Sequence, residues 1–147
     1  RVDREGPQGE EMSERTYVML KPDAVRRGFT GRILQRFEDA GLQMAAMQRL
    51  AVSEAQSKAL YAEHEGKPFY DSLLTYIHSG PVVATVWEGA GAVALARKLI
   101  GATDPAQAAP GTIRGDFGLV MDENVVHGSD SAESAEREIL IFFPGLD

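Results

Sequence analysis

Two short runs of strand-forming residues constrain the fold of this 147-residue chain more than any other feature. Residues 82–87 (Val-Val-Ala-Thr-Val-Trp) and residues 16–20 (Thr-Tyr-Val-Met-Leu) are rich in apolar and β-branched or aromatic side chains and show no polar alternation. A strand with one face in water alternates polar and apolar residues, whereas a strand buried on both faces does not. The sequence therefore predicts that both runs are interior strands of a sheet.

Helical periodicity and capping signals predict helices between the strands. We expect helices at about residues 30–40, 53–66, 69–77, 92–100 and 132–143. Two further strands are expected at residues 42–52, with a bulge at Met47, and at residues 124–127. No period survives between residues 102 and 118, where prolines and glycines predict a long loop. Such loops in compact domains are usually functional or disordered, and the Thr112-Ile113-Arg114 centre favours function.

The order of these elements predicts the fold class. They follow a βαββαβ pattern with extra helices, which indicates an α+β, ferredoxin-like fold with a four-stranded antiparallel sheet and flanking helices. One domain is expected, because 147 residues with a hydrophobic fraction of 44% suit a single core. Residues 1–11 are polar and precede Met12-Ser13, so we expect a disordered or expression-derived extension there and the domain at residues 12–147.

Charge and cysteine content exclude several kinds of function. The absence of cysteine excludes disulfides, thiolate nucleophiles and cysteine-bound zinc, and it favours a reducing, cytoplasmic setting. A net charge of −7 argues against nucleic-acid binding through a broad basic face. No run has the apolar length of a membrane span, and the first eleven residues are too polar for a signal peptide. An anionic substrate would need a local cationic pocket.

Three partial motifs suggest other chemistries but lack the context that each requires. Residues 89–94 match a relaxed dinucleotide-binding fingerprint, yet a long loop replaces the parallel strand that should follow the helix. His64, His78 and His127 have none of the spacings typical of metal-binding helices, so no protein metal site is expected. Ser129 lies close to His127 in sequence, but no nucleophile-elbow motif supports a hydrolase triad.

Residues 124–131 (Asn-Val-Val-His-Gly-Ser-Asp-Ser) hold the best candidate for chemistry. His127 ends a short apolar run and precedes a glycine, so its ring is expected at a strand end where little covers it. Asp130 and Ser131 offer N-cap side chains for the next helix, and Glu138 on that helix could return its carboxylate towards the imidazole. A histidine beside a helix start can also merely support the cap, and these residues alone leave both interpretations open.

Four segments carry a family resemblance. They are Lys21-Pro22-Asp23, Pro81-Val82-Val83, Pro110-Gly111-Thr112-Ile113-Arg114-Gly115-Asp116 and Asn124-x-x-His127-Gly128-Ser129-Asp130-Ser131. Together they resemble the nucleoside diphosphate kinase family, in register from about Arg15 to Phe143. The resemblance implies ping-pong transfer, in which His127 takes the γ-phosphoryl group of a nucleoside triphosphate such as ATP and passes it to a nucleoside diphosphate. A neutral imidazole suits this role because it is nucleophilic and also leaves readily.

The resemblance also implies roles for residues around His127. Glu138 matches the position that orients the ring, with Ser129 as its expected hydrogen-bond partner. Phosphoryl transfer needs fixed cations around the transferred group. The residues that match phosphate-binding positions are Lys21, Arg97 and Arg114, with Tyr61 and Thr103 as hydroxyl contacts. On spacing alone Lys21 and Arg97 could be charges on the surface of a strand end and a helix. Arg114 is expected in a glycine-flanked loop, where it has no helix or strand surface to solvate.

Four residues match the family's nucleoside-binding positions. Phe69 is implied to stack on the base beside Leu73, Met121 stands where the family often has valine, and Asn124 contacts the sugar. Stacking reads no base edge, which implies tolerance of every nucleobase. Without the resemblance, Phe69 could simply be a core residue. Mg²⁺ is expected to arrive bound to the nucleotide phosphates rather than in a protein cage.

The implied partners are nucleoside di- and triphosphates and further copies of the chain, as a homo-hexamer or homo-tetramer, with no membrane and no specific nucleic acid. Two alternatives belong to other functional classes. A nucleotide-sensing module that has lost turnover is disfavoured because every matched catalytic position is filled. A ferredoxin-like nucleic-acid binder is disfavoured by the acidic net charge.

Overall fold

The computed structural model describes residues 13–147. The extension expected at residues 1–11 lies outside the described residues. The elements are β1 (Ser13–Leu20), α2 (Pro22–Arg26), α3 (Thr30–Asp39), β2 (Gln43–Leu50), α4 (Glu54–Leu60), η1 (Ala62–His64), α5 (Tyr70–Ile77), β3 (Val82–Ala90), α6 (Ala92–Ile100), η2 (Pro105–Gln107), α7 (Ile113–Phe117), β4 (Val126–Gly128) and α8 (Ala132–Phe142). Among these helices, none is both long and apolar enough to cross a bilayer.

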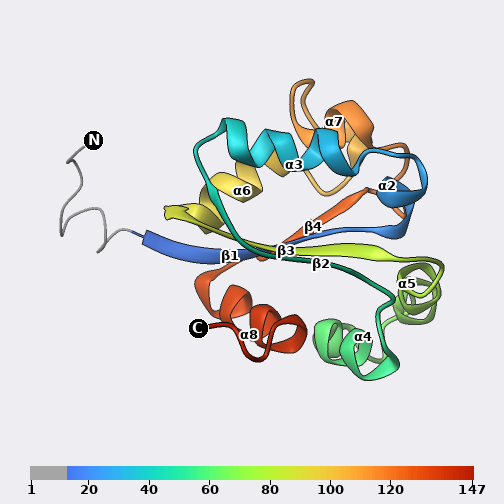
Figure 1. The fold of residues 1–147 in the computed structure, drawn as a ribbon. Coiled ribbons are helices and arrows are strands. Elements are labelled where there is room, and N and C mark those ends of the chain that lie inside the picture. The colour runs from blue at the N-terminus through green and yellow to red at the C-terminus, as the bar shows by residue number, and fades with distance from the viewer. Residues whose placement is uncertain (1–12) are drawn as a thin grey trace, which may run out of the picture.

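The four strands form one antiparallel sheet in the order β2-β3-β1-β4 (Figure 1). This arrangement confirms the predicted α+β, ferredoxin-like fold. The two runs predicted as interior strands are β1 and β3, and they pair from Ser13 opposite Ala90 to Leu20 opposite Val83. The shorter pairing between β1 and β4 places His127 opposite Met19. The candidate nucleophile therefore lies on an edge strand, next to the buried half of β1.

Helices cover both faces of the sheet. On one face lie α2, α3, α6 and α7, and on the other lie α4, α5 and α8 (Figure 1). Val18 and Leu20 belong to the same buried cluster as Phe37 of α3, whereas Tyr17 and Phe142 of α8 belong to the cluster on the opposite face. Because successive residues from Tyr17 to Leu20 enter two different cores, this half of β1 shows no polar alternation.

Several elements differ from the sequence prediction, among them the helix expected at residues 53–66, which is divided into α4 and η1. Residues 22–26 form α2, where the sequence suggests a strand end and a turn; Pro22 is well suited to a first helical position because it needs no amide donor. The bulge in β2 lies between Met44 and Ala46 rather than at Met47. The last strand spans Val126–Gly128 rather than residues 124–127, because Val125 has a φ of 61° that interrupts extended backbone.

The predicted loop at residues 102–118 contains two short helices, η2 and α7. Arg114 therefore lies on a helix, so the expectation that it belongs to no helix or strand was wrong. A five-residue helix cannot display a helical period, and α7 is instead specified by its cap. The hydroxyl of Thr112 accepts a hydrogen bond from the Gly115 amide at 3.1 Å and donates one to the Ala109 carbonyl at 2.6 Å.

Gly115→Ala is expected to destabilise the protein at α7. A Cβ at this position would overlap the carbonyl oxygen of Ala109 and lie 2.8 Å from the Thr112 hydroxyl, so the backbone would have to move. Overpacking of this kind lowers the free energy of unfolding by about 1–3 kcal/mol. Gly31→Ala in α3 is the matched control, because a Cβ there meets nothing within 4 Å. Urea denaturation compares the two variants, and equal stability would contradict the close packing around residue 115.

Candidate functional site

A cleft of about 590 Å³ collects side chains from segments far apart in the sequence. It is lined by all but one of the predicted site residues, namely Lys21, Tyr61, Phe69, Leu73, Arg97, Thr103, Arg114, Met121, Asn124, His127 and Glu138. The exception is Ser129, which is fully buried and reaches the site through a hydrogen bond to Glu138. The fold thus brings together residues that span more than one hundred positions of the chain.

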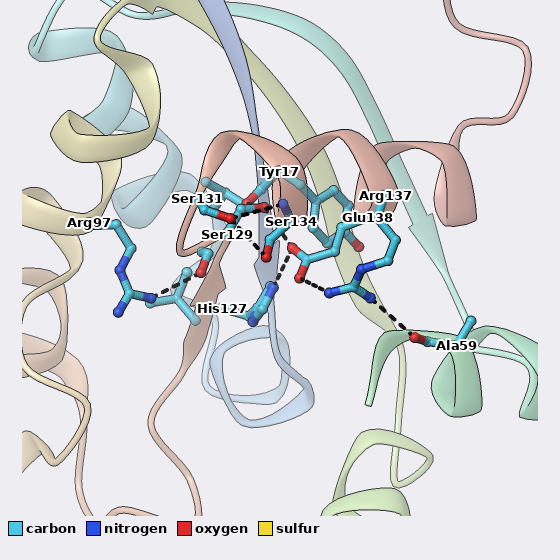
Figure 2. Close-up of polar contacts among 12 residues, drawn as sticks. Tyr17, Ala59, Arg97, His127, Ser129, Ser131, Ser134, Arg137 and Glu138 are labelled. Atoms are coloured by element: carbon cyan, nitrogen blue, oxygen red, sulfur yellow. Dashed lines mark hydrogen bonds and ion pairs between the residues drawn. The ribbon is translucent and has the colours of Figure 1, made fainter. Parts of the chain in front are cut away.

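Glu138 holds the His127 ring by one nitrogen. Its Oε1 lies 2.8 Å from Nε2 of His127, and the hydroxyl of Ser129 donates to the same oxygen at 2.6 Å (Figure 2). The Ser129 amide in turn donates to the Tyr17 carbonyl on β1 at 3.1 Å. Among the described residues, none forms a hydrogen bond with Nδ1 of His127. This geometry assigns Nε2 to the carboxylate and leaves Nδ1 available to a substrate.

The position of Glu138 follows from the helix that carries it. Ser131 caps α8 by accepting a hydrogen bond from the Ser134 amide at 3.0 Å, and the buried Ala135 and Phe142 set which face meets the sheet. Glu138 lies on that face and is only 4% exposed. Burial alone would raise its pKa, but the hydrogen bonds from His127 and Ser129 outweigh burial, and the pKa of Glu138 lies below its usual value. The group is therefore a carboxylate at neutral pH.

Arg114 joins α7 to the strand that carries the histidine. Its guanidinium donates to the carbonyls of Val126 at 2.6 Å, Asn124 at 3.3 Å and Gly101 at 3.4 Å. A guanidinium has five N–H donors, so two remain for an anion in the cleft. Burial, followed by the nearby Arg97, lowers the pKa of Arg114 to about 10. The side chain is still a cation at neutral pH.

Lys21 is a second buried cation. Its Nζ donates to Oδ1 of Asn124 at 2.8 Å, and the Asn124 amide donates to the Thr103 carbonyl at 3.0 Å. Burial, followed by repulsion from Arg114, lowers the pKa of Lys21 to about 7. Two N–H donors of the ammonium remain for a ligand. An anion bound here would favour the charged form of the amine.

A strained residue separates Asn124 from the histidine strand. Val125 has a φ of 61°, a conformation that β-branched residues rarely adopt. Its carbonyl accepts a hydrogen bond from the Lys21 amide at 2.8 Å, and Arg114 binds the carbonyls of both neighbouring residues. These contacts hold the kink, and residues on both sides of it, Asn124 and His127, line the cleft.

The opposite wall of the cleft is aromatic and partly exposed. Phe69 is 48% exposed, so it is not the core residue that was the alternative interpretation. The lining residues that sequence reasoning missed include two with rings, His64 and Tyr76. The His64 ring meets Phe69 edge-on at 5.4 Å between centroids. Tyr76 follows Phe69 and Leu73 at the spacing i, i+4, i+7, a helical signal that could have identified it.

The arrangement suits nucleophilic chemistry on a phosphorylated substrate. Arg97 of α6 donates to the Gly128 carbonyl at 3.1 Å, which places a third cation next to His127 (Figure 2). Fixed cations stabilise the charge of a transferring phosphoryl group, and an aromatic side chain at the rim can stack on a planar base. The cleft therefore combines an imidazole nitrogen without a protein partner among the described residues, a carboxylate on the other nitrogen, three cations and an exposed aromatic ring.

Comparisons with known proteins identify the family of the chain. A model of the nucleoside diphosphate kinase family matches residues 14–147. The nucleoside diphosphate kinase of Mycobacterium tuberculosis is 58% identical over 135 residues, which cover 91% of this chain and 99% of that protein. The enzyme of Desulfitobacterium hafniense is 55% identical over 130 residues, covering 88% of this chain and 87% of its own.

Solved structures extend the comparison to the fold. A halophilic nucleoside diphosphate kinase from Halobacterium salinarum, in complex with CDP, has a TM-score of 0.87 and 51% identity, and the match covers 89% of this chain and 88% of that chain. The enzyme from Encephalitozoon cuniculi also has a TM-score of 0.87, with 43% identity and 88% of each chain covered. The chain therefore belongs to the nucleoside diphosphate kinase family.

Proposed function

We propose that the enzyme moves the γ-phosphoryl group of a nucleoside triphosphate to a nucleoside diphosphate in two half-reactions, with His127 as the carrier. The observation that supports this most is that the two nitrogens of the His127 ring have different partners. Nε2 is 2.8 Å from the Glu138 carboxylate, whereas Nδ1 has no hydrogen-bond partner among the described residues and is part of a side chain that lines the cleft. A histidine held in this way can accept a phosphoryl group and pass it on, which divides one difficult transfer into two easier ones.

In the first half-reaction, the Nδ1 lone pair attacks the γ-phosphorus. The P–N bond forms as the bond to the β,γ-bridging oxygen breaks, and the nucleoside diphosphate leaves with the electron pair. The ring becomes more positive as it acquires the phosphoryl group, and the Glu138 carboxylate at Nε2 stabilises that charge. In the second half-reaction a different nucleoside diphosphate takes the phosphoryl group by the reverse path, which returns His127 to its starting state.

The remaining lining residues position the nucleotide. We assign the phosphates to Lys21, Arg97 and Arg114, with the hydroxyls of Thr103 and Tyr61 as further contacts. We assign the sugar to Asn124 and the base to the wall of Phe69, Leu73 and Met121. The CDP complex of the Halobacterium salinarum relative supports binding of a nucleoside diphosphate. Magnesium would enter as part of the nucleotide substrate.

We also propose self-association, as a homo-hexamer or homo-tetramer, and a cytoplasmic location. Large apolar side chains that are more than half exposed, including Met47, Leu119 and Leu140, leave surface that a second copy could bury. The cysteine-free composition favours a reducing compartment.

The two-step mechanism predicts a burst of ADP in the absence of any acceptor. Mixing the enzyme with excess ATP should release one ADP per active site and then stop, because the phosphorylated enzyme has no partner. Adding GDP or UDP should restart turnover and produce GTP or UTP. Rapid-quench analysis of ADP gives the amplitude of the burst. A direct transfer mechanism would instead release no ADP until the acceptor is added, and that result would exclude the carrier role of His127.

The lowered pKa of Lys21 predicts that nucleotide binding depends on pH. Burial, followed by Arg114, lowers the pKa of Lys21 to about 7, so the free enzyme loses this positive charge as the pH rises above 7. The terminal phosphate is already mostly ionised in this range, since its second pKa is about 6. We expect the Kd for ADP to rise about 10-fold between pH 7 and pH 9.

Calorimetric titration with ADP at several pH values measures this dependence. Lys21→Met should bind weakly throughout and show a nearly flat profile from pH 7 to pH 9. An unchanged slope in Lys21→Met would assign the titration to another group.

A further inference from the structure

Two residues outside the cleft fasten α7, the helix of Arg114, to α3. Arg36 of α3 donates to Oδ2 of Asp116 at 2.8 Å and to the Gly111 carbonyl at 3.1 Å, and Oδ1 of Asp116 accepts from the Gly111 amide at 2.9 Å. These three residues form a closed ring of contacts, which we call the α3–α7 clamp. Gly111 has a φ of 96°, a left-handed conformation that glycine adopts without strain.

The end of α7 is tied to the same region. The Arg36 guanidinium lies 5.0 Å from the centre of the Phe117 ring, and Arg27 donates to the Phe117 carbonyl at 2.9 Å. The Phe29 ring also packs against Phe117, with 4.9 Å between centroids. The Gly111 amide, followed by Arg36, keeps the pKa of Asp116 below its usual value, so the carboxylate stays ionised at neutral pH. Both ends of the helix are therefore held from α3 and the turn before it.

A helix of this length depends on such ties. α7 has five residues, and a single helical turn is unstable without tertiary support. Its buried residues are Ile113 and Arg114, and Arg114 points away from the clamp to the carbonyls of Asn124 and Val126 beside the histidine. Any displacement of α7 would therefore move the guanidinium relative to the bound phosphates.

We propose that Arg36 and Asp116 are positioning residues that hold Arg114 in the geometry needed to bind nucleotide phosphates. The proposal rests on the phosphate-binding role of Arg114 given above. Neither Arg36 nor Asp116 lines the cleft, so neither can act by touching the nucleotide. Their side chains are 30% and 33% exposed, which makes the ion pair sensitive to salt.

A direct electrostatic effect of the two charges on the nucleotide makes a different prediction from the clamp for Asp116. If Arg36 simply attracted the anionic nucleotide, then removing the Asp116 carboxylate would strengthen binding. If the two residues act as a clamp, removing either one weakens binding. Arg32 is the matched control, because it lies on the same helix and its guanidinium contacts the Phe29 ring at 5.5 Å rather than α7.

The test measures the Kd for ADP and the single-turnover rate with ATP in Arg36→Ala, Asp116→Ala, Arg32→Ala and Arg114→Ala, and in double variants. We expect Arg36→Ala and Asp116→Ala each to raise the Kd about 3- to 10-fold, as for the loss of a partly exposed ion pair with its hydrogen bonds. The Arg36→Ala/Asp116→Ala double variant should match either single one. In an Arg114→Ala background, Arg36→Ala should add nothing, because its target is already absent.

The outcomes separate the two proposals. Normal binding by Arg114→Ala would overturn the phosphate-binding role itself. The positioning role alone would be overturned if Arg114→Ala bound ADP weakly but Arg36→Ala bound it normally. It would also be overturned if Arg36→Ala weakened binding further in the Arg114→Ala background. Tighter binding by Asp116→Ala, or an equal loss in Arg32→Ala, would replace the clamp by a charge effect. Asp116→Asn, which keeps the acceptor for the Gly111 amide, serves if the alanine variant does not fold.

Discussion

His127→Ala should lower the rate of phosphoryl transfer by at least about 10⁴-fold, the scale of loss seen when a covalent nucleophile is removed. The nearby Ser129 cannot replace it, because this side chain is fully buried and its hydroxyl donates to Glu138. Incubation with γ-labelled ATP should label the wild-type protein with an acid-labile, base-stable group. The variant should take up no such label, and a label that survived in it would exclude His127 as the carrier.

His78→Ala is the matched control for this experiment. Its Nε2 lies 2.9 Å from the Ser57 hydroxyl, and His78 does not line the cleft. The control should therefore retain full labelling. Binding of ADP to His127→Ala should remain close to that of the wild type, since the phosphate-binding cations are unchanged. Parallel loss of binding and labelling would instead indicate that the variant has lost the cleft.

Arg114→Ala should lower kcat/KM by about 10²- to 10³-fold, with both weaker binding and slower transfer. The guanidinium has two N–H donors to offer an anion, and its loss would remove one of the two buried cations that we assign to the phosphates. Single-turnover kinetics with ATP separate binding from the transfer step. Unchanged steady-state kinetics would remove Arg114 from the phosphate site.

A structural effect of Arg114→Ala must be separated from the loss of charge, because the side chain also binds three carbonyls. Addition of free guanidinium ions should restore part of the transfer rate if the missing charge is responsible. Thermal melting reports whether the fold is retained. Failure of rescue in a well-folded variant would place the main role of Arg114 in shaping the backbone around Asn124 and Val126.

The sequence predicted the interior of the fold well because its signals there are long. Residues 16–20 of β1 and 82–87 of β3 are buried on both faces, and runs made mostly of apolar residues suit that environment. The same reasoning failed for α7 and α2, which have five residues each and cannot show a period. The backbone kink at Val125 was also invisible, since no residue type there indicates a positive φ.

For the site, residue identities could be predicted but their chemical roles depended on three-dimensional contacts. The resemblance, which runs in register from about Arg15 to Phe143, supplied eleven of the lining residues that the cleft brings together. It could not indicate which nitrogen of His127 faces Glu138, because that follows from the angle between β4 and α8. The lowered pKa of Lys21 likewise arises from burial beside Arg114, and burial is a property of the packed molecule.

Locating the phosphoryl group on the trapped enzyme tests the account most directly. Wild-type protein mixed with ATP and rapidly freed of nucleotide can be examined by phosphorus–nitrogen NMR correlations of the histidine ring. The contact between Nε2 and Glu138 predicts a single phosphoryl group bonded to Nδ1 of His127. A phosphoryl group on Nε2, or on any other residue, would contradict the proposed mechanism.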